Sequence, residues 1–271
     1  MRGIALDPNP DRPVRGRRPI ENPRLARTFR AFLTHAKSNR LSIGILWQRM
    51  EAGGAGDFHL RHQIFLDLFQ KIWAAWDARL KSERAIDFED MLGLAADYVE
   101  AGRWESPYEL VMVDEFQDVN NLQVELIKLL LTDDTQLFCV GDDWQSIYGF
   151  RGSNVSYIVE FENHFTDAKT IKLNLNYRST QNIVGASNEV IRHNKFKVEK
   201  DVQASKMSEH KIVVFAGNTE EENIQFCVDK VREILNDGIS NDEILFLYRR
   251  SKMFTPYFYR FKNENIRVQG K

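Results

Sequence analysis

The sequence predicts an α/β fold in which helices flank a mainly parallel sheet. Two observations support this class. From Pro23 to Ala101, apolar residues recur at three- and four-residue spacing, which is typical of amphipathic helices. After residue 86, strand-like and helix-like stretches alternate, as they do where helices connect parallel strands. With 43% hydrophobic residues, the 271-residue chain can build the core of one large domain or two ordinary ones.

Composition and charge limit the functional classes. The 37 basic and 39 acidic residues give a formal charge of -2, so the chain lacks the global basic footprint of a dedicated nucleic-acid-binding domain, and any such contact must be local. No apolar run approaches the roughly 18 residues needed to span a bilayer, and we expect a soluble protein without a membrane partner. Cys139 and Cys227 lack metal-ligand spacing, so we expect them to pack in the core in a reducing cytoplasm.

The N-terminal third is expected to contain an arm and then helices. Residues 1–23 hold most of the prolines and several arginines, which indicates a disordered arm. Acidic residues at 87–90 indicate a helix start. The apolar stripes that we expect helices to bury are Leu25, Phe29, Phe32 and Leu33 in one helix and Ile64, Leu68, Ile72 and Trp76 in another.

Alternating elements follow from residue 110 onward. The predicted strands are Leu110–Val113, Gln136–Val140 and Thr170–Leu175, and the predicted helices between and after them are Asn121–Leu131 and Thr180–His193. The polar run Lys195–Lys211 is expected to be a linker to a second α/β set. That set has predicted strands at Lys211–Phe215 and Glu243–Tyr248 and predicted helices at Glu220–Leu235 and Lys252–Lys262.

Two adjacent acids, Asp114 and Glu115, follow the first predicted strand, which we expect to be buried. Ligands of open α/β sheets bind at the carboxyl ends of the strands. Neighbouring carboxylates there can hold a divalent cation and orient an attacking water, as phosphoryl transfer to water requires. The pair alone is better explained by the polarity of loops, and only its neighbours favour the catalytic interpretation.

The two following strands also end in chemically distinctive residues. Gln145 offers both a donor and an acceptor, which suits the sensing of a terminal phosphate and its water. Tyr148 and Phe150 lie beside Arg151, a composition used for stacking on unpaired bases, although both rings could equally pack in a core. At the third strand, Arg178 could clamp phosphate and Tyr177 could face a base, unless they are only a strand-end pair.

Three of these stretches, in this order, resemble motifs II, III and IV of the superfamily 1A DNA helicases, the family of UvrD, Rep and PcrA. They are Asp-Glu-Phe-Gln-Asp at 114–118, Gly-Asp-Asp-Trp-Gln-Ser-Ile-Tyr-Gly-Phe-Arg-Gly at 141–152 and Leu-Asn-Tyr-Arg-Ser at 175–179. The form of the middle motif resembles the DNA helicase IV branch. Residues 87–90, Asp-Phe-Glu-Asp, resemble a short motif upstream of the acidic one in this family.

The resemblance implies an ATP site with Mg²⁺. In it, Asp114 would hold magnesium through water, and Glu115 would be the general base for the attacking water. Gln117 and Asp118 would support that network, and Gln145 would report the γ-phosphate to the DNA side.

The resemblance also implies contacts with DNA and with the rest of the nucleotide. Tyr177 would stack on adenine, and Arg178 would contact the γ-phosphate. Phe150, with Tyr148 nearby, would stack on a single-stranded base, and Arg151 would link the two sites. The implied partners are single-stranded and duplex DNA, and the implied location is the cytoplasm, in association with the nucleoid.

In that family, ATP lies between two RecA-like domains, and its hydrolysis drives 3′ to 5′ translocation and unwinding in DNA repair, replication or recombination. Residues 24–196 would then be a partial first RecA-like domain with a helical insertion, and 197–271 the beginning of the second. The sequence contains no Gly-x-x-x-x-Gly-Lys-Ser/Thr phosphate loop, and the family's late motifs are missing. We therefore expect an internal fragment that hydrolyses ATP feebly or not at all.

Three alternatives stay open from the sequence. The chain could be a non-catalytic nucleic-acid-binding remnant that has lost the phosphate loop. It could belong to the motor subunit of a helicase–nuclease. A metal-dependent nuclease using Asp114, Asp142 and Asp143 is a third possibility.

Overall fold

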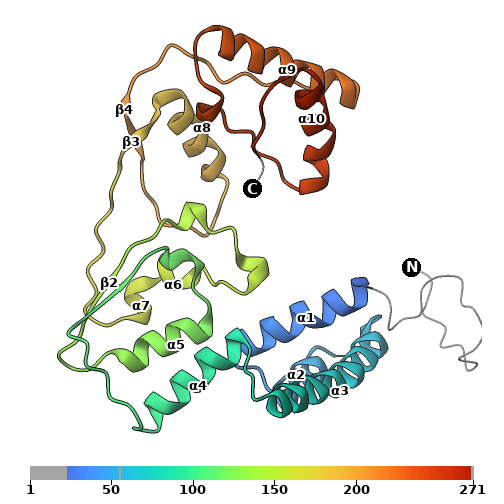
Figure 1. Ribbon diagram of the computed structural model, residues 1–271. Coiled ribbons are helices and arrows are strands. Elements are labelled where there is room, and N and C mark those ends of the chain that lie inside the picture. Colours follow the sequence, from blue (N-terminus) through green and yellow to red (C-terminus); the bar gives the residue numbers. More distant parts are fainter. Residues whose placement is uncertain (1–22, 55, 270–271) are drawn as a thin grey trace, which may run out of the picture. The chain divides into compact units, whose positions relative to one another are not determined.

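Helices and short parallel strands alternate in the computed structural model, which describes residues 23–54 and 56–269 (Figure 1). The α/β class is thereby confirmed, while the arm expected at residues 1–23 lies, except for Pro23, outside the described residues. The chain divides into two compact units. The first contains residues up to Asn174 together with Asn188–Asp201, and the second contains Leu175–Ser187 and the chain from Val202 onward.

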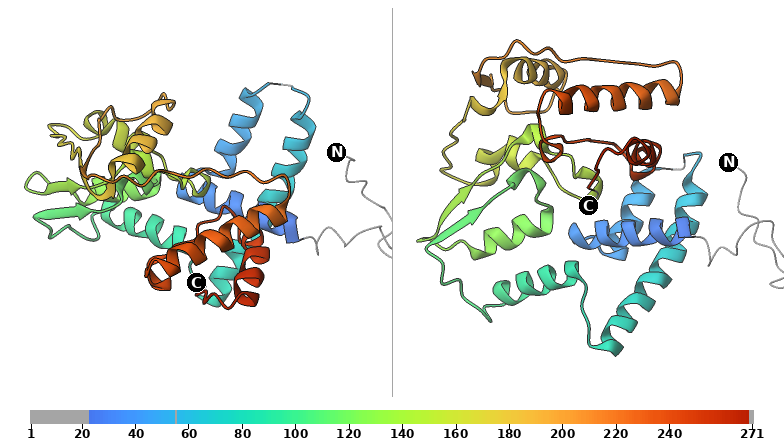
Figure 2. Two further views of the ribbon diagram at one scale, coloured as in Figure 1. Left: turned by 90° about the horizontal axis from the view of Figure 1, so that it is seen from above. Right: turned by 45° about the horizontal axis from the view of Figure 1, so that its top comes forward.

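The helical region of the first unit consists of α1 (Pro23–Ser38), α2 (Ile43–Ala52), α3 (His59–Glu83) and α4 (Phe88–Glu100). The α4 helix begins as expected, because the carboxylate of Asp87 accepts a hydrogen bond from the backbone N–H of Asp90 and two acids lie in the first turn. The α2 and α3 helices lie side by side (Figure 2).

A core of large aromatic side chains joins α1, α2 and α3. Phe29 and Phe69 are buried, and the ring of Phe32 packs edge-on against Phe69 with the centroids 4.7 Å apart. Phe65 stacks on Phe29 at 5.0 Å. The predicted stripe of α1 therefore faces this core, with Leu33 buried beside it.

The predicted stripe of α3 is wrong. Its four members keep between 39% and 50% of their surface exposed, and they are Ile64, Leu68, Ile72 and Trp76. The face that packs on α1 instead contains Leu66 and Phe69. The 25-residue helix carries apolar residues on two faces, and the bulky phenylalanines of α1 select the face whose rings they can stack against.

A buried cation joins α1 to α3 and α4. The ammonium of Lys37 lies 2.8 Å from Asp87, 2.7 Å from Asp90 and 3.5 Å from Asp77, and its side chain is 8% exposed. The Trp76 indole N–H also donates to Asp87. Burial alone would lower the pKa of Lys37, but the hydrogen bonds that Lys37 donates to Asp87 and Asp90 outweigh it and raise that pKa. Asp87 and Asp90 of the 87–90 motif thus form ion pairs that hold α1 against α4.

The sheet of the first unit consists of β1 (Leu110–Val113) and β2 (Gln136–Cys139), which pair in parallel from Leu110 opposite Gln136 to Val113 opposite Cys139. The α5 helix (Asn121–Leu130) connects them and starts at a capping box formed by Asn120 and Gln123. Both predicted strands and the predicted helix are confirmed to within one residue. The carboxyl ends of β1 and β2 therefore meet at one edge.

One face of this sheet packs on α5. Val113, Leu137 and Cys139 contact the cluster of Phe116 and Val124. The side chains that point to the other face of the sheet are exposed, and Met112 keeps 67% of its surface accessible. The expectation of a strand buried on both faces is therefore wrong for the described chain, in which α5 covers one side. Burial raises the pKa of the Cys139 thiol to about 12, which suits a packing role.

Short helical turns follow the strands of the first unit: η2 (Phe116–Asp118), η3 (Asp143–Gln145), η4 (Gly149–Arg151), α6 (Ser156–Val159) and α7 (Phe161–His164). The first three contain half of the predicted site residues, namely Gln117, Asp118, Gln145, Phe150 and Arg151. An antiparallel bridge between Asn120 and Ser153 ties the turn after η4 to the start of α5.

The second unit contains a separate two-stranded parallel sheet and three longer helices. Its elements are β3 (Leu175–Thr180), α8 (Gln181–Arg192, which continues into the first unit), β4 (Gln203–Lys206), α9 (Glu220–Asn236), η5 (Asn241–Glu243) and α10 (Ser251–Asn263). The α9 and α10 helices pack through Val228 and Phe261. The three predicted helices are confirmed. No helix of the described chain is long and apolar enough to cross a membrane.

Three strand predictions and the linker are corrected in this part of the chain. The third strand begins at Leu175 rather than Thr170, and the expected linker contains β4. Residues 211–215 and 243–248 form no strand, and Val214 and Leu247 are 89% and 80% exposed. Apolar alternation needs a neighbouring strand to become a sheet, and the described residues offer these segments none.

Replacing Lys37 with Met is expected to destabilise the first unit. The substitution leaves three carboxylates near one another without their cation, at a cost of about 2 kcal/mol, because the aspartates keep some contact with water. Urea unfolding followed by circular dichroism measures the loss, and the exposed Lys71→Met on α3 serves as the matched control.

The difference between the wild type and Lys37→Met should depend on pH. Burial alone would raise the pKa of Asp87, but the hydrogen bonds that Asp87 accepts from Lys37, the Asp90 backbone and Trp76 hold it below 3.8, and the pKa of Lys37 lies above 10.5. The stabilisation is therefore complete between these values. It disappears as the pH falls through the lowered pKa of Asp87 or rises through the raised pKa of Lys37. A pH-independent difference would contradict this account.

Candidate functional site at the carboxyl ends of β1 and β2

The two acids predicted as the hydrolytic centre lie immediately after β1, and both are exposed. The backbone N–H of Glu115 donates to Asp114 Oδ1 at 2.9 Å. Glu115 has φ 51°, in the left-handed region, which costs a residue with a Cβ about 1 kcal/mol. The chain thus turns sharply at this residue and directly enters η2.

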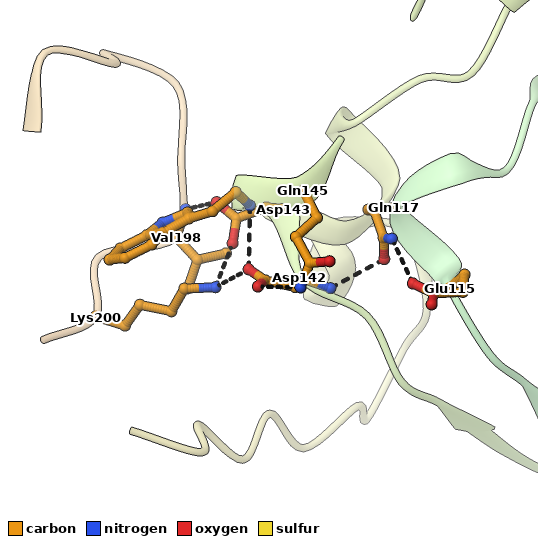
Figure 3. A network of polar contacts seen from close by, with 8 residues as sticks. Glu115, Gln117, Asp142, Asp143, Gln145, Val198 and Lys200 are labelled. Atoms are coloured by element: carbon orange, nitrogen blue, oxygen red, sulfur yellow. Dashed lines mark hydrogen bonds and ion pairs between the residues drawn. The ribbon is translucent and has the colours of Figure 1, made fainter. Parts of the chain in front are cut away.

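Gln117 joins the ends of the two strands. It is 2% exposed, and its Nε2 donates to Glu115 Oε2 at 2.7 Å. Its Oε1 accepts from the backbone N–H of Asp142 at 2.9 Å (Figure 3). Ser146 Oγ donates to the Gln117 carbonyl oxygen at 3.2 Å. A buried amide therefore fixes the Glu115 carboxylate relative to the loop after β2.

The loop after β2 can approach Gln117 so closely because residue 141 is glycine. A Cβ at Gly141 would lie 2.7 Å from Gln117 Oε1 and 2.7 Å from Ile158 Cδ1. Both distances are shorter than a carbon side-chain atom tolerates, so any larger residue would have to displace Gln117 or the loop.

Asp142 organises the polar side of the same loop. Its Oδ2 accepts from Gln145 Nε2 at 2.8 Å, and its Oδ1 accepts from Lys200 Nζ at 2.6 Å. Burial would raise the pKa of Asp142, but the hydrogen bonds from Lys200 and Gln145 outweigh it and hold that pKa below its ordinary value. Gln145 itself is exposed, and its amide nitrogen is held by Asp142 at the strand ends.

Asp118 lies beside Glu115 in η2 but outside this set of hydrogen bonds. Its Oδ1 is buried without a hydrogen-bond partner. Burial and the charge of Glu115 raise the pKa of Asp118. Its supporting role stays a prediction.

Tyr148 and Phe150 of the second motif are at the surface. Phe150 is 80% exposed and Tyr148 is 36% exposed, so Phe150 does not pack in the core. The Arg151 guanidinium carbon lies 5.0 Å from the Tyr148 ring centroid and 5.6 Å from that of Phe150. A cation between two exposed rings can offer both charge and a stacking face to a nucleic acid base.

Tyr177 and Arg178 lie on β3, in the second unit. Tyr177 is 69% exposed, and Arg178 is exposed as well. The backbone N–H groups of Arg178 and Ser179 donate to Asn176 Oδ1 at 3.0 and 2.8 Å, which fixes the strand around both side chains. Neither side chain packs into a core.

The acids proposed for a nuclease do not form a metal cluster. Within residues 23–54 and 56–269, no three His, Cys, Asp or Glu side chains come together in a way that could hold a metal. Asp142 and Asp143 instead bind Lys200. The Asp114, Asp142 and Asp143 alternative thus lacks the ligand set that it requires.

Sequence reasoning missed Lys200, which lies in the run expected to be a linker. Its partner acids are 57 and 58 residues away, and no local spacing indicates such a contact. The adjacent acids Asp142 and Asp143 directly after a strand could have indicated a nearby cation, because buried carboxylates need a partner.

The chain matches two family models. Residues 19–166 match the UvrD/REP helicase N-terminal domain, and residues 171–270 match the UvrD-like helicase C-terminal domain. It is 32% identical over 213 residues to the ATP-dependent DNA helicase PcrA of Leuconostoc citreum, an alignment that covers 77% of this chain and 27% of that protein. Identity to PcrA of Staphylococcus epidermidis is 31% over 217 residues, covering 78% and 29%. The chain thus spans little more than a quarter of the length of these relatives.

Replacing Gly141 with Ala is expected to destabilise the fold by about 1–3 kcal/mol, because the added methyl group collides with Gln117 and Ile158. Urea unfolding measures the change. Gly149→Ala is the matched control, since a Cβ there meets nothing within 4 Å, and it should change stability by less than about 0.5 kcal/mol. Equal effects of the two substitutions would mean that the close approach at Gly141 does not constrain the loop.

Proposed function

The chain belongs to the UvrD/REP helicase family, and on that premise we propose that it is part of an ATP-dependent DNA helicase that moves 3′ to 5′. The observation that carries the proposal is the linkage of Glu115 to the loop after β2 through buried Gln117. It brings a carboxylate and the Gln145 amide to one edge of a parallel sheet, where such folds bind ligands.

On the nucleotide side, Asp114 would hold Mg²⁺, which would neutralise phosphate charge when bound, and Glu115 would accept the proton of the attacking water. Both carboxylates are exposed at the strand end, as a group that meets nucleotide and solvent must be. Magnesium retains several waters and takes few protein carboxylates beside phosphate oxygens, so a single exposed Asp fits it. Gln117 orients Glu115, and Gln145 contacts the γ-phosphate side of the water.

The second unit supplies the rest of the proposed nucleotide contacts. Tyr177 stacks on adenine and Arg178 contacts the γ-phosphate, roles that their exposed positions on β3 allow. In this proposal, residues 24–196 form part of a first RecA-like domain with a helical insertion, and 197–271 begin a second. Tyr177 and Arg178 then lie near the end of the first domain, although they group with the second compact unit. ATP hydrolysis changes the arrangement of two such domains and so moves the DNA strand.

On the DNA side, Phe150 stacks on a base, and Arg151, held against Phe150 and Tyr148, supplies positive charge. With a formal charge of -2, the chain as a whole offers no excess of positive charge to a phosphate backbone. DNA binding therefore depends on this local site.

The 271 residues alone hydrolyse ATP weakly in this proposal, because the sequence has no phosphate-loop lysine for the β/γ-phosphates. A non-catalytic DNA-binding remnant is the competing function. A full-length protein that carries this chain and binds single-stranded DNA without hydrolysing ATP would favour the remnant.

Glu115→Gln in the full-length protein is expected to lower the DNA-stimulated rate of ATP hydrolysis at least about 100-fold, because the amide cannot accept the water's proton. The Gln117 contact is retained in part, so ATP binding should persist. Phosphate release measures the rate. Glu109→Gln, just before β1, is the matched control, and unchanged hydrolysis in Glu115→Gln would show that another group is the base.

Phe150→Ala is expected to weaken the binding of a single-stranded oligonucleotide by about 5- to 100-fold through loss of one stacked base. Fluorescence anisotropy of labelled oligo-dT at fixed salt measures the affinity. Phe88→Ala is the matched control, because Phe88 is 81% exposed and Phe150 80%. Equal affinities for all three proteins would rule out stacking at Phe150.

A further inference from the structure

A segment that lies far from the second motif in sequence contacts the loop after β2. Asn188–Asp201 belongs to the first unit although the chain on both sides of it belongs to the second. Two of its residues contact the loop: the backbone N–H of Val198 donates to Asp143 Oδ2 at 2.8 Å, and Lys200 binds the same acid (Figure 3).

Lys200 has three partners in the loop. Its Nζ lies 2.6 Å from Asp142 Oδ1 and 2.8 Å from Asp143 Oδ1, and 4.7 Å from the ring centroid of Trp144. The lysine side chain is 14% exposed and that of Asp143 is 3% exposed. Charges so far removed from water interact strongly, and each would be costly to leave unpaired.

These contacts continue to two of the predicted catalytic residues, Gln145 and Glu115. One oxygen of Asp142 binds Lys200 and the other accepts from the Gln145 amide. The backbone N–H of Asp142 donates to Gln117, which donates to Glu115. Lys200 therefore fixes the carboxylate that orients Gln145, and it stabilises the loop conformation that orients Glu115.

Loss of the lysine charge would release this arrangement. Asp142 and Asp143 would then be adjacent carboxylates with no cation between them, and their repulsion would favour rotation of Asp142 toward water. Gln145 would lose its acceptor. Lys197, on the same segment, pairs with Glu199 and donates to the Asn194 carbonyl oxygen instead of to the aspartates of the loop, so it serves as the matched control.

We propose that Lys200 is a positioning residue for ATP hydrolysis, which acts through Asp142 to hold the Gln145 side chain. The inference rests on the proposed helicase function, in which Gln145 contacts the γ-phosphate side. In this proposal, the segment 188–201 supports hydrolysis: the ion pairs of Lys200 with the loop hold Gln145 in place, and their loss leaves Gln145 disordered.

The first test reads the position of Gln145 without nucleotide. In ¹⁵N spectra of the 271-residue chain, the side-chain NH₂ signals of Gln145 are identified by their loss in Gln145→Ala. We expect Lys200→Met to shift them, Lys200→Arg to shift them less, and Lys197→Met to leave them unchanged. If Lys200→Met does not fold, Lys200→Gln, which keeps a donor for one carboxylate, takes its place. Unshifted Gln145 signals in a folded Lys200 variant overturn the proposal.

The second test measures steady-state ATP hydrolysis by the full-length protein. Lys200→Met should lower kcat about tenfold with KM for ATP changed less than about twofold, because the misplaced group acts after binding. Lys200→Arg should recover most of kcat, and Lys197→Met should match the wild type. Unchanged kcat in Lys200→Met, or an equal loss in Lys197→Met, overturns the role in hydrolysis.

The two tests separate the inference from the proposed function. A wild-type protein that does not hydrolyse ATP refutes the helicase function and the hydrolytic role together. The Gln145 signals still decide whether Lys200 positions that side chain.

Discussion

The candidate site depends on one buried amide, that of Gln117. Parallel pairing brings the carboxyl ends of β1 and β2 to one edge, but pairing alone leaves the loops beyond them free to diverge. Gln117 prevents this by donating to Glu115 and accepting from the backbone of Asp142. An amide can do both at once, whereas a carboxylate in this position could only accept. The absence of a side chain at Gly141 is the steric condition for that arrangement.

The sequence predicts elements well where local periodicity decides them and poorly where pairing decides them. The helices α5, α8, α9 and α10 were predicted within one or two residues, because capping residues and apolar spacing are local signals. The Gln203–Lys206 strand has no apolar alternation and forms because β3 is its neighbour. The exposed face of α3 shows the same principle, since periodicity identifies two apolar faces but not the one that a neighbour will cover.

The candidate site was predictable as a set of residues but not as a network. The order of the motifs indicated that Glu115, Gln117 and Gln145 act together, and the structure places them in one unit connected by hydrogen bonds. The long-range cations could not be foreseen. Lys37 and Lys200 reach their aspartates across 50 and 58 residues, and both neutralise acids of motifs that otherwise suggest chemistry alone. Acids in a catalytic motif can therefore serve the fold as well.

The path of the chain between the two units has a topological consequence. It passes from the first unit to the second after Asn174, returns after Ser187, and leaves again after Asp201. Cleavage of one peptide bond therefore cannot release either unit whole. The paired strands β3 and β4 are separated in sequence by a stretch that belongs to the first unit. During synthesis, β3 of the second unit is therefore made before the first unit is complete, and β3 must wait for residues beyond 201 before it can pair with β4.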